Sequence, residues 1–163
     1  MSIVLLVLAA LLLVGTVSSS WFTPSRGSGG VGLTGVEACR GGECRSVSWG
    51  DMPKAPKDLA ALGWFGLLGG LSAVGVTVAA GVMGLTGKAQ RIPFKPFSIV
   101  YGLAACSMTM FFMRVLTEFT RGLSIGFAGI LAIGALIAIS VLVKLVSTPT
   151  AAPAPAWPAT PAR

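Results

Sequence analysis

The sequence has no histidine and few charged residues. Charged residues make up 10% of its 163 residues and hydrophobic residues 54%, whereas a soluble domain has about 25% charged residues. So few charges cannot cover the surface of a soluble globule of this length, and lipid is the expected main solvent. The lack of histidine removes the commonest general base, the usual haem ligand and most zinc ligand sets.

Patterns of catalytic or ligand-binding residues are also missing. The sequence contains no paired carboxylates, no phosphate-binding loop and no nucleophile beside a base. The apolar segments hold no acidic residue in their centres, where ion carriers generally keep an ionisable group. We therefore expect a protein that is not an enzyme, with no cofactor, no metal and no small-molecule substrate.

The net charge of +7 comes from basic residues that are scattered among the loops. No run of basic residues and no basic helix face is present, so we expect no nucleic-acid partner. Basic loops beside membrane helices interact with anionic lipid headgroups. Membrane lipid is therefore the first expected partner.

Four apolar segments predict transmembrane helices, each of which needs about 20 residues. The predicted spans are residues 1–20, 59–86, 97–119 and 123–146. The first is short, and the small residues at its end leave two readings open, a signal anchor or a cleaved signal peptide; no positive charge precedes it, which favours the uncleaved span. Asp58 precedes the second span as a predicted N-cap.

The charges of the loops predict the orientation. Residues 87–96 hold three basic side chains and no acid, whereas residues 21–58 are nearly balanced. The positive-inside rule places the first of these loops in the cytoplasm. Residues 21–58 and the short turn 120–122 are then extracellular, and both termini are cytoplasmic, in a multi-pass protein of the plasma (inner) membrane. Residues 147–163 are rich in proline and alanine and predict a disordered cytoplasmic tail.

Small residues recur at a spacing that lets membrane helices approach closely. Gly66 and Gly70 lie four residues apart in the second span, as do Gly122 and Gly126 at the start of the fourth. We expect these glycines to pack inside the bundle; a face for a partner's transmembrane helix is the alternative. Cys106 is expected to be a small packing residue in the third span.

Two further cysteines predict a stapled β-hairpin. The residues between Cys39 and Cys44 include Gly41 and Gly42, which are suited to a two-residue turn with positive φ at both positions. Folding the chain there puts the two cysteines in a non-hydrogen-bonded pair, close enough for a disulfide. Such a bond persists in an oxidising compartment outside the cell. We expect a structural disulfide.

The same register pairs Arg40 with Glu43 and Val36 with Val47, on neighbouring strands. A redox-active pair would favour Cys-x-x-Cys beside a helix N-terminus. A metal site would need two more ligands, and only acidic residues are available without histidine. Both alternatives therefore fit the sequence less well than the structural disulfide.

These features resemble the claudin and peripheral-myelin-protein superfamily, which includes the gamma subunits of calcium channels. That family has four spans and a first extracellular loop with a Trp, a Gly-Leu-Trp and two bonded cysteines. Here Thr34 stands where the family has its second Trp, and the two cysteines are closer together than in claudins. The residues of the predicted hairpin motif, besides the cysteines, are Trp21, Gly32, Leu33, Gly41, Gly42 and Trp49.

The resemblance and the spans together predict an all-α membrane protein. The expected architecture is a four-transmembrane-helix bundle with a small disulfide-stapled extracellular β-hairpin or sheet between helices 1 and 2. The expected function is protein–protein contact in membrane organisation, by self-association or with a membrane protein partner. The alternatives are a small accessory subunit of a channel or respiratory enzyme and, third, a thiol-disulfide membrane oxidoreductase.

Overall fold

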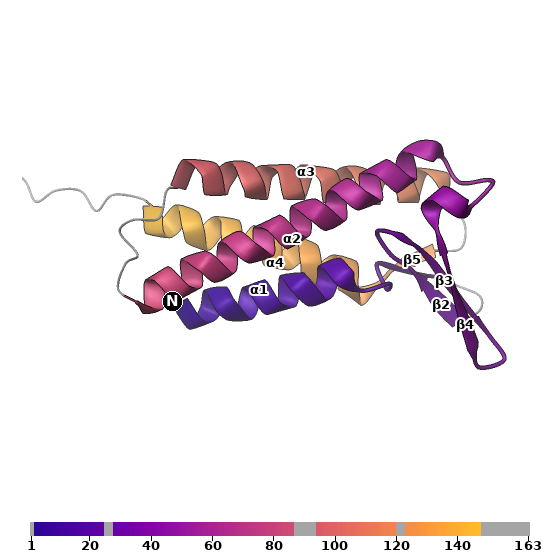
Figure 1. Cartoon of the computed structure of the whole chain (residues 1–163), viewed down its shortest axis with the longest axis horizontal. Helices are drawn as coiled ribbons and strands as arrows, with labels where there is room; N and C mark the ends of the chain where they lie inside the picture. Colours follow the sequence, from indigo (N-terminus) through magenta and orange to yellow (C-terminus); the bar gives the residue numbers. More distant parts are fainter. Residues whose placement is uncertain (1, 25–27, 87–93, 120–122, 148–163) are drawn as a thin grey trace, which may run out of the picture.

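The computed structural model describes residues 2–24, 28–86, 94–119 and 123–147. The predicted turn 120–122, Gly122, most of the predicted basic loop and the tail from residue 148 lie outside these described residues. In the described part, helices run side by side along the long axis and a small sheet extends from one end (Figure 1). The helices are α1 (Ser2–Val17), α2 (Lys57–Leu85), α3 (Phe94–Glu118) and α4 (Phe127–Ser147).

Three of the described helices are long and apolar enough to cross a membrane, which indicates a membrane protein. These segments are Lys57–Leu85, Phe97–Glu118 and Phe127–Lys144. Helix α1 is apolar but has only 16 residues, which corresponds to about 24 Å, somewhat less than the hydrocarbon core of a bilayer. The fourth predicted span, residues 1–20, therefore stays a prediction.

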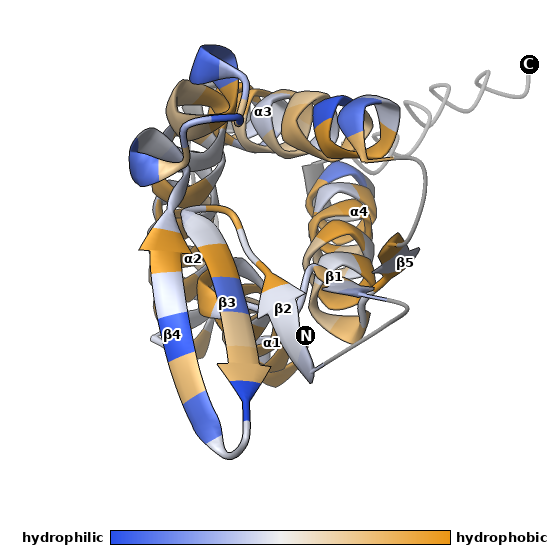
Figure 2. Cartoon of the chain, turned by 90° about the vertical axis from the view of Figure 1, so that its right-hand side faces the viewer, coloured by the Kyte–Doolittle hydropathy of each residue, from blue (hydrophilic) through white to orange (hydrophobic). Residues whose placement is uncertain are grey.

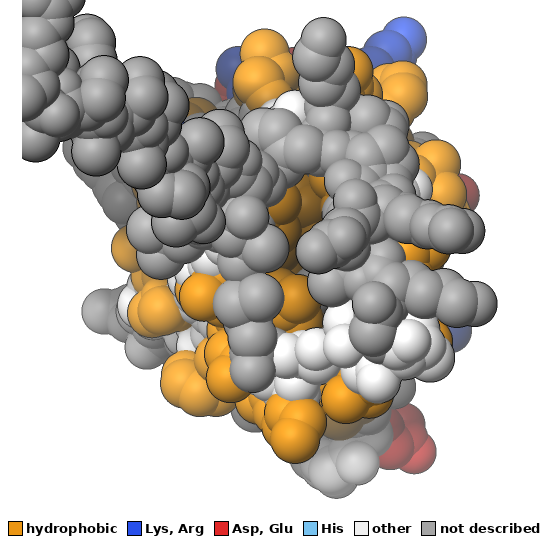
Figure 3. Space-filling view, turned by 90° about the vertical axis from the view of Figure 1, so that its left-hand side faces the viewer, with side chains coloured by type: hydrophobic (Ala, Val, Ile, Leu, Met, Phe, Trp, Pro, Cys, Tyr) orange, Lys and Arg blue, Asp and Glu red, His pale blue; other side chains and the backbone are white. Residues whose placement is uncertain are grey.

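The helices bury small and apolar side chains against one another and turn large apolar side chains outward. Helix α1 packs against both α2 and α4, and α3 packs along α2. Leu12, Ala73 and Met108 are buried between them, while Leu103 and Ile137 are more than half exposed. An exposed apolar surface of this kind is what a lipid-facing helix presents. In Figure 3, hydrophobic side chains also make up much of the visible described surface at the end away from the sheet.

The sheet is larger than the predicted hairpin. It has five antiparallel strands in the order β4-β3-β2-β1-β5, and its last strand comes from beyond α3. The strands are β1 (Phe22–Pro24), β2 (Ser28–Val31), β3 (Gly35–Arg40), β4 (Glu43–Ser48) and β5 (Leu123–Ile125). The prediction that the fourth span starts at residue 123 is therefore wrong, because residues 123–125 pair with β1 and the helix begins at Phe127.

One face of the sheet carries an apolar row that crosses every strand. Directly opposed residues in an antiparallel sheet point to the same face. In this register, each member of the row is directly opposed to the next member on the neighbouring strand. Exposure rises from the buried centre of the row to about 37% and 50% at its two ends. The row consists of Ile125, Phe22, Val31, Val36 and Val47.

The start of α2 differs from the prediction. Asp58 is not the N-cap, since the helix begins at Lys57, two residues earlier than predicted, and Pro56 occupies the N-cap position. The Asp58 carboxylate instead accepts a bond of 2.8 Å from Arg114 near the end of α3, and Arg114 also pairs with Glu118. This ion-pair group links the sheet-side ends of two helices.

Candidate functional site

The predicted hairpin is confirmed in its turn, its register and its staple. Gly41 and Gly42 have φ angles of +60° and +89°, the values of a type I′ turn, which matches the twist of the strands that it joins. Cys39 and Cys44 are opposed and form a disulfide. The neighbouring pairs, Arg40 with Glu43 and Val36 with Val47, are also those that the sequence predicts.

The outer strand of this hairpin is the exposed margin of the sheet. All six residues of β4 are exposed, and β4 pairs with β3 on one side only. Figure 2, which looks along the helices from the sheet side, shows the hairpin turn reaching beyond the outline of the helix bundle. In this register, residues of non-hydrogen-bonded pairs such as Ser46 direct their N–H outward. Strand β4 therefore offers free backbone groups to another chain.

An aromatic cluster joins the sheet to the helices. Trp21 is fully buried and donates its indole N–H to the Gly15 carbonyl oxygen at 2.7 Å. Trp49 donates its indole N–H to the Gly32 carbonyl oxygen at 3.2 Å. Both tryptophan rings contact Phe111 of α3 edge-on, with centroids 6.3 and 6.2 Å away. The predicted motif residues thus meet around a phenylalanine that the sequence analysis did not single out.

Leu33 anchors the turn between β2 and β3 in the bundle. Its side chain is 2% exposed and lies over Gly66 of α2. A Cβ atom at Gly63 would collide with the Leu33 carbonyl oxygen, which is rigid backbone. Gly63 was missed by the sequence analysis because its partner is far away in the sequence. Gly32 closes the same turn by donating its N–H to the Gly35 carbonyl oxygen.

The predicted packing glycines have different surroundings. Gly70 of α2 lies against Thr16 of α1 and Met108 of α3, as expected for a residue inside the bundle. Gly66 lies mainly against Leu33 of the loop before β3, with Met108 of α3 also within 4 Å. The prediction for Gly126 is wrong in kind, because this residue precedes α4 and lies against the backbone of Ser20 at the entrance to β1.

The prediction for Cys106 is also wrong. Cys106 is a free thiol on α3, and it is exposed. Its neighbour Ala104 is fully buried against the bundle, because a helix turns about 100° per residue and side chains two positions apart point in nearly opposite directions. Cys106 therefore faces outward from the bundle.

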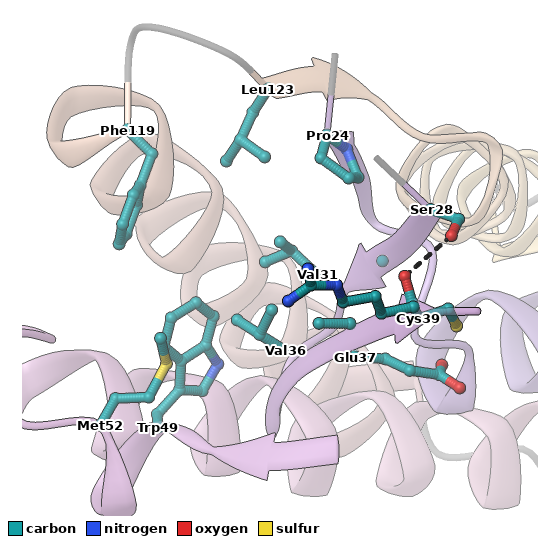
Figure 4. Close-up of a pocket in the computed structure, with 13 residues that line it drawn as sticks. Pro24, Ser28, Val31, Val36, Glu37, Cys39, Trp49, Met52, Phe119 and Leu123 are labelled. Carbon is teal, nitrogen blue, oxygen red and sulfur yellow. Dashed lines mark hydrogen bonds between the residues drawn. The ribbon is translucent and has the colours of Figure 1, made fainter. Parts of the chain in front are cut away.

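A cleft of about 560 Å³ lies between the apolar face of the sheet and the end of α3. Figure 4 shows Val31 and Val36 pointing into this space from the sheet, with Trp49, Phe119 and Leu123 around it. Its volume is within the range of about 300–1,000 Å³ for ligand pockets. The lining residues are Pro24, Ser28, Gly30, Val31, Val36, Glu37, Ala38, Cys39, Arg40, Trp49, Met52, Phe119 and Leu123.

The polar groups around the cleft are mostly engaged elsewhere. Ser28 donates its hydroxyl to the Cys39 carbonyl oxygen at 3.0 Å, and Glu37 accepts a bond of 2.7 Å from Ser19. Figure 4 shows the Glu37 carboxylate directed away from the space. Arg40 makes no ion pair with any described residue. The described lining of the cleft thus combines an apolar surface with one cationic side chain, Arg40, that has no described ion-pair partner.

A cluster of Glu37 with the two hairpin cysteines brings three potential metal-binding atoms within 4.8 Å of one another. The two sulfur atoms are bonded to each other, so they are not the thiolates that bind metal. Among the described residues, no buried side-chain nitrogen or oxygen lacks a hydrogen-bond partner. The cluster therefore offers one half-buried carboxylate rather than a metal centre.

No protein-family model and no curated protein matches this sequence. The function of this protein must therefore be inferred from its residues and their geometry, together with the resemblance of the loop motif.

Proposed function

We propose that this protein is a claudin-like tetraspan that works by protein–protein contact, with its five-stranded sheet outside the plasma membrane as the contact module. The observation that carries the proposal is the exposed margin strand β4, which is held rigid by the Cys39–Cys44 disulfide. An unpaired strand edge can recruit another chain, and the two charged residues of β4, Glu43 and Arg45, have opposite signs, so the strand has no net charge. Self-association is the simplest use of such an edge.

The anchoring of the sheet supports this proposal. Trp21, Leu33 and Trp49 are each no more than 3% exposed and are packed against α2 and α3. A sheet that is fixed in this way presents β4 in one orientation relative to the membrane. A fixed orientation lowers the entropy cost of forming a contact between two copies.

The orientation belongs to the proposal as well. The predicted orientation depends on residues 87–96 being cytoplasmic, because this loop contains three basic residues and no acidic residue. Four spans, with residues 1–20 as the first, then place both termini in the cytoplasm. The sheet lies in an oxidising compartment, where the disulfide persists.

The test is self-association of two differently tagged full-length copies. The copies are placed together in one membrane or in apposed vesicles, and co-capture is measured after mild solubilisation. We expect Ser46→Pro to abolish co-capture, because it removes an outward N–H without breaking a bond to β3. The Cys39→Ser, Cys44→Ser pair should weaken it by loosening the hairpin.

The matched control is Cys106→Ser, which removes the exposed thiol of α3 and should leave co-capture unchanged. Retention of the disulfide in Ser46→Pro shows that its hairpin still folds. A wild-type protein that stays monomeric in both arrangements would overturn the proposal.

The second candidate function, an accessory subunit of a larger membrane complex, is favoured by one observation. Gly75 of α2, Gly102 of α3 and Gly134 of α4 all lie on outward faces, where an added Cβ would meet no atom within 4 Å. Small residues on an outer face let a partner's helix approach closely. Recovery with one stoichiometric larger protein would favour this function over self-association.

A further inference from the structure

We propose that the cleft between the sheet and α3 binds a fatty-acid-like amphiphile from the adjacent membrane leaflet, with its single acyl chain along the apolar row and its anionic head at Arg40. This inference goes beyond protein contact through β4, since it concerns a different surface of the sheet. It depends on three features of the cleft: its apolar lining, its paired backbone and its cation.

The lining suits a hydrocarbon chain. Val31 and Val36 form the floor, and Trp49, Met52 and Phe119 form one wall. Aromatic rings and a flexible methionine adapt to the shape of an apolar chain. Burial of each methylene group in such a surface is favourable. The apolar lining therefore gives the chain, rather than the head, most of its affinity.

The backbone of the cleft argues for an acyl chain over a peptide. Strand β3 is paired with β2 on one side and β4 on the other over most of its length. Its amide and carbonyl groups are therefore used within the sheet, and the floor is a sheet face instead of a free edge. A peptide on this floor would bury its own amides without partners, which costs free energy. An acyl chain has no such groups.

The charge of the cleft selects the head. Strand alternation places Arg40 on the same face as Val36, beyond Ala38. Arg40 is exposed and forms no ion pair with a described residue, although Glu43 is opposite it in register. Guanidinium groups bind carboxylates through paired hydrogen bonds. The apolar lining thus extends toward α3, and Arg40 occupies the last position of β3, next to the hairpin turn.

The position of the cleft makes the membrane the source. Phe119 follows the end of α3, one of the three helices that can cross a membrane. The chain of a bound amphiphile would point toward the bundle and its head toward the hairpin turn. This is also the polarity of a lipid in the leaflet next to the sheet, so the molecule enters without turning over.

The experiment uses the full-length protein in phosphatidylcholine nanodiscs with photoactivatable palmitate and, as a neutral probe, its methyl ester. Crosslinked residues are mapped by mass spectrometry. Labels on outward side chains of the helices, such as Leu103 and Ile137, report simple partition into lipid. We expect the acid to label cleft residues, and to do so in preference to the ester.

The variants separate the head from the chain. Arg40→Gln should lower cleft labelling by the acid about tenfold, the usual effect of losing one charged hydrogen bond, and should leave helix labelling unchanged. Arg45→Gln, the matched control, removes the same charge from the same face of the next strand and should change labelling less than about twofold. Ala38→Phe, at an exposed position, should block both probes by filling the cleft.

Three results would overturn the inference. Cleft labelling no stronger than labelling of the helix faces would show partition alone. Equal loss in Arg45→Gln and Arg40→Gln would show a general effect of charge. An unlabelled cleft, together with loss of self-association in Ala38→Phe, would assign the cleft to a protein partner.

Discussion

At the scale of single residues, a glycine is required for stability where another segment's backbone approaches it too closely for a Cβ atom. Gly63 lies where the turn before β3 meets α2, and a Cβ there would strike the Leu33 carbonyl oxygen. Gly75, three turns further along the same helix, has no atom within 4 Å of the corresponding position. The two glycines therefore make a matched pair within one helix.

We predict that Gly63→Ala destabilises the protein and that Gly75→Ala does not. Moving backbone to relieve the collision costs about 1–3 kcal/mol, whereas alanine in an open helical position is neutral or slightly favourable. The measurement is the thermal unfolding midpoint of the solubilised protein for both variants. Equal midpoints would mean that Leu33 does not lie on Gly63.

The residues that sequence reasoning missed share one property, which is that their partners are distant along the chain. The motif residues Trp21, Leu33 and Trp49 could be selected from the loop itself. Phe111 could not, because only the packing of α3 beneath the loop shows that both tryptophans contact it. The partner of Asp58, Arg114, is 56 residues away, and capping was the local alternative that the sequence favoured.

At the scale of elements, the hairpin was predictable and the rest of the sheet was not. The turn type, the register and the disulfide of β3 and β4 follow from two glycines and two cysteines that are close in the sequence. Strand β5 is three residues long and pairs with β1 about 100 residues away. Its apolar sequence continues into α4, so hydropathy alone extended the helix across it.

The hairpin turn gives a prediction at this scale. Gly41→Asn should be tolerated, because asparagine adopts positive φ, whereas Gly41→Val should cost about 1–2 kcal/mol. The measurement is hydrogen exchange of the β3 and β4 amides, which should be about tenfold faster in the valine variant. Exchange in α2 is the internal control and should not change. Equal exchange in both variants would contradict the type I′ turn.

At the scale of the whole molecule, composition established the membrane character and left the number of spans open. The helices α2, α3 and α4 have the length and apolarity to cross a bilayer. Helix α1 packs along α2 and α4 but is shorter. The apolar sequence of α1 predicts a helix, but its 16 residues are too few for hydropathy alone to decide whether it spans the membrane.

We propose that the disulfide-stapled sheet lies outside the membrane. The most direct measurement is thiol labelling of Cys39 and Cys44 in intact cells with a membrane-impermeant maleimide, in a Cys106→Ser background that removes the remaining thiol. We expect labelling only after an impermeant reductant is added outside. Labelling without reductant would contradict the disulfide, and labelling only after the cells are permeabilised would contradict the orientation.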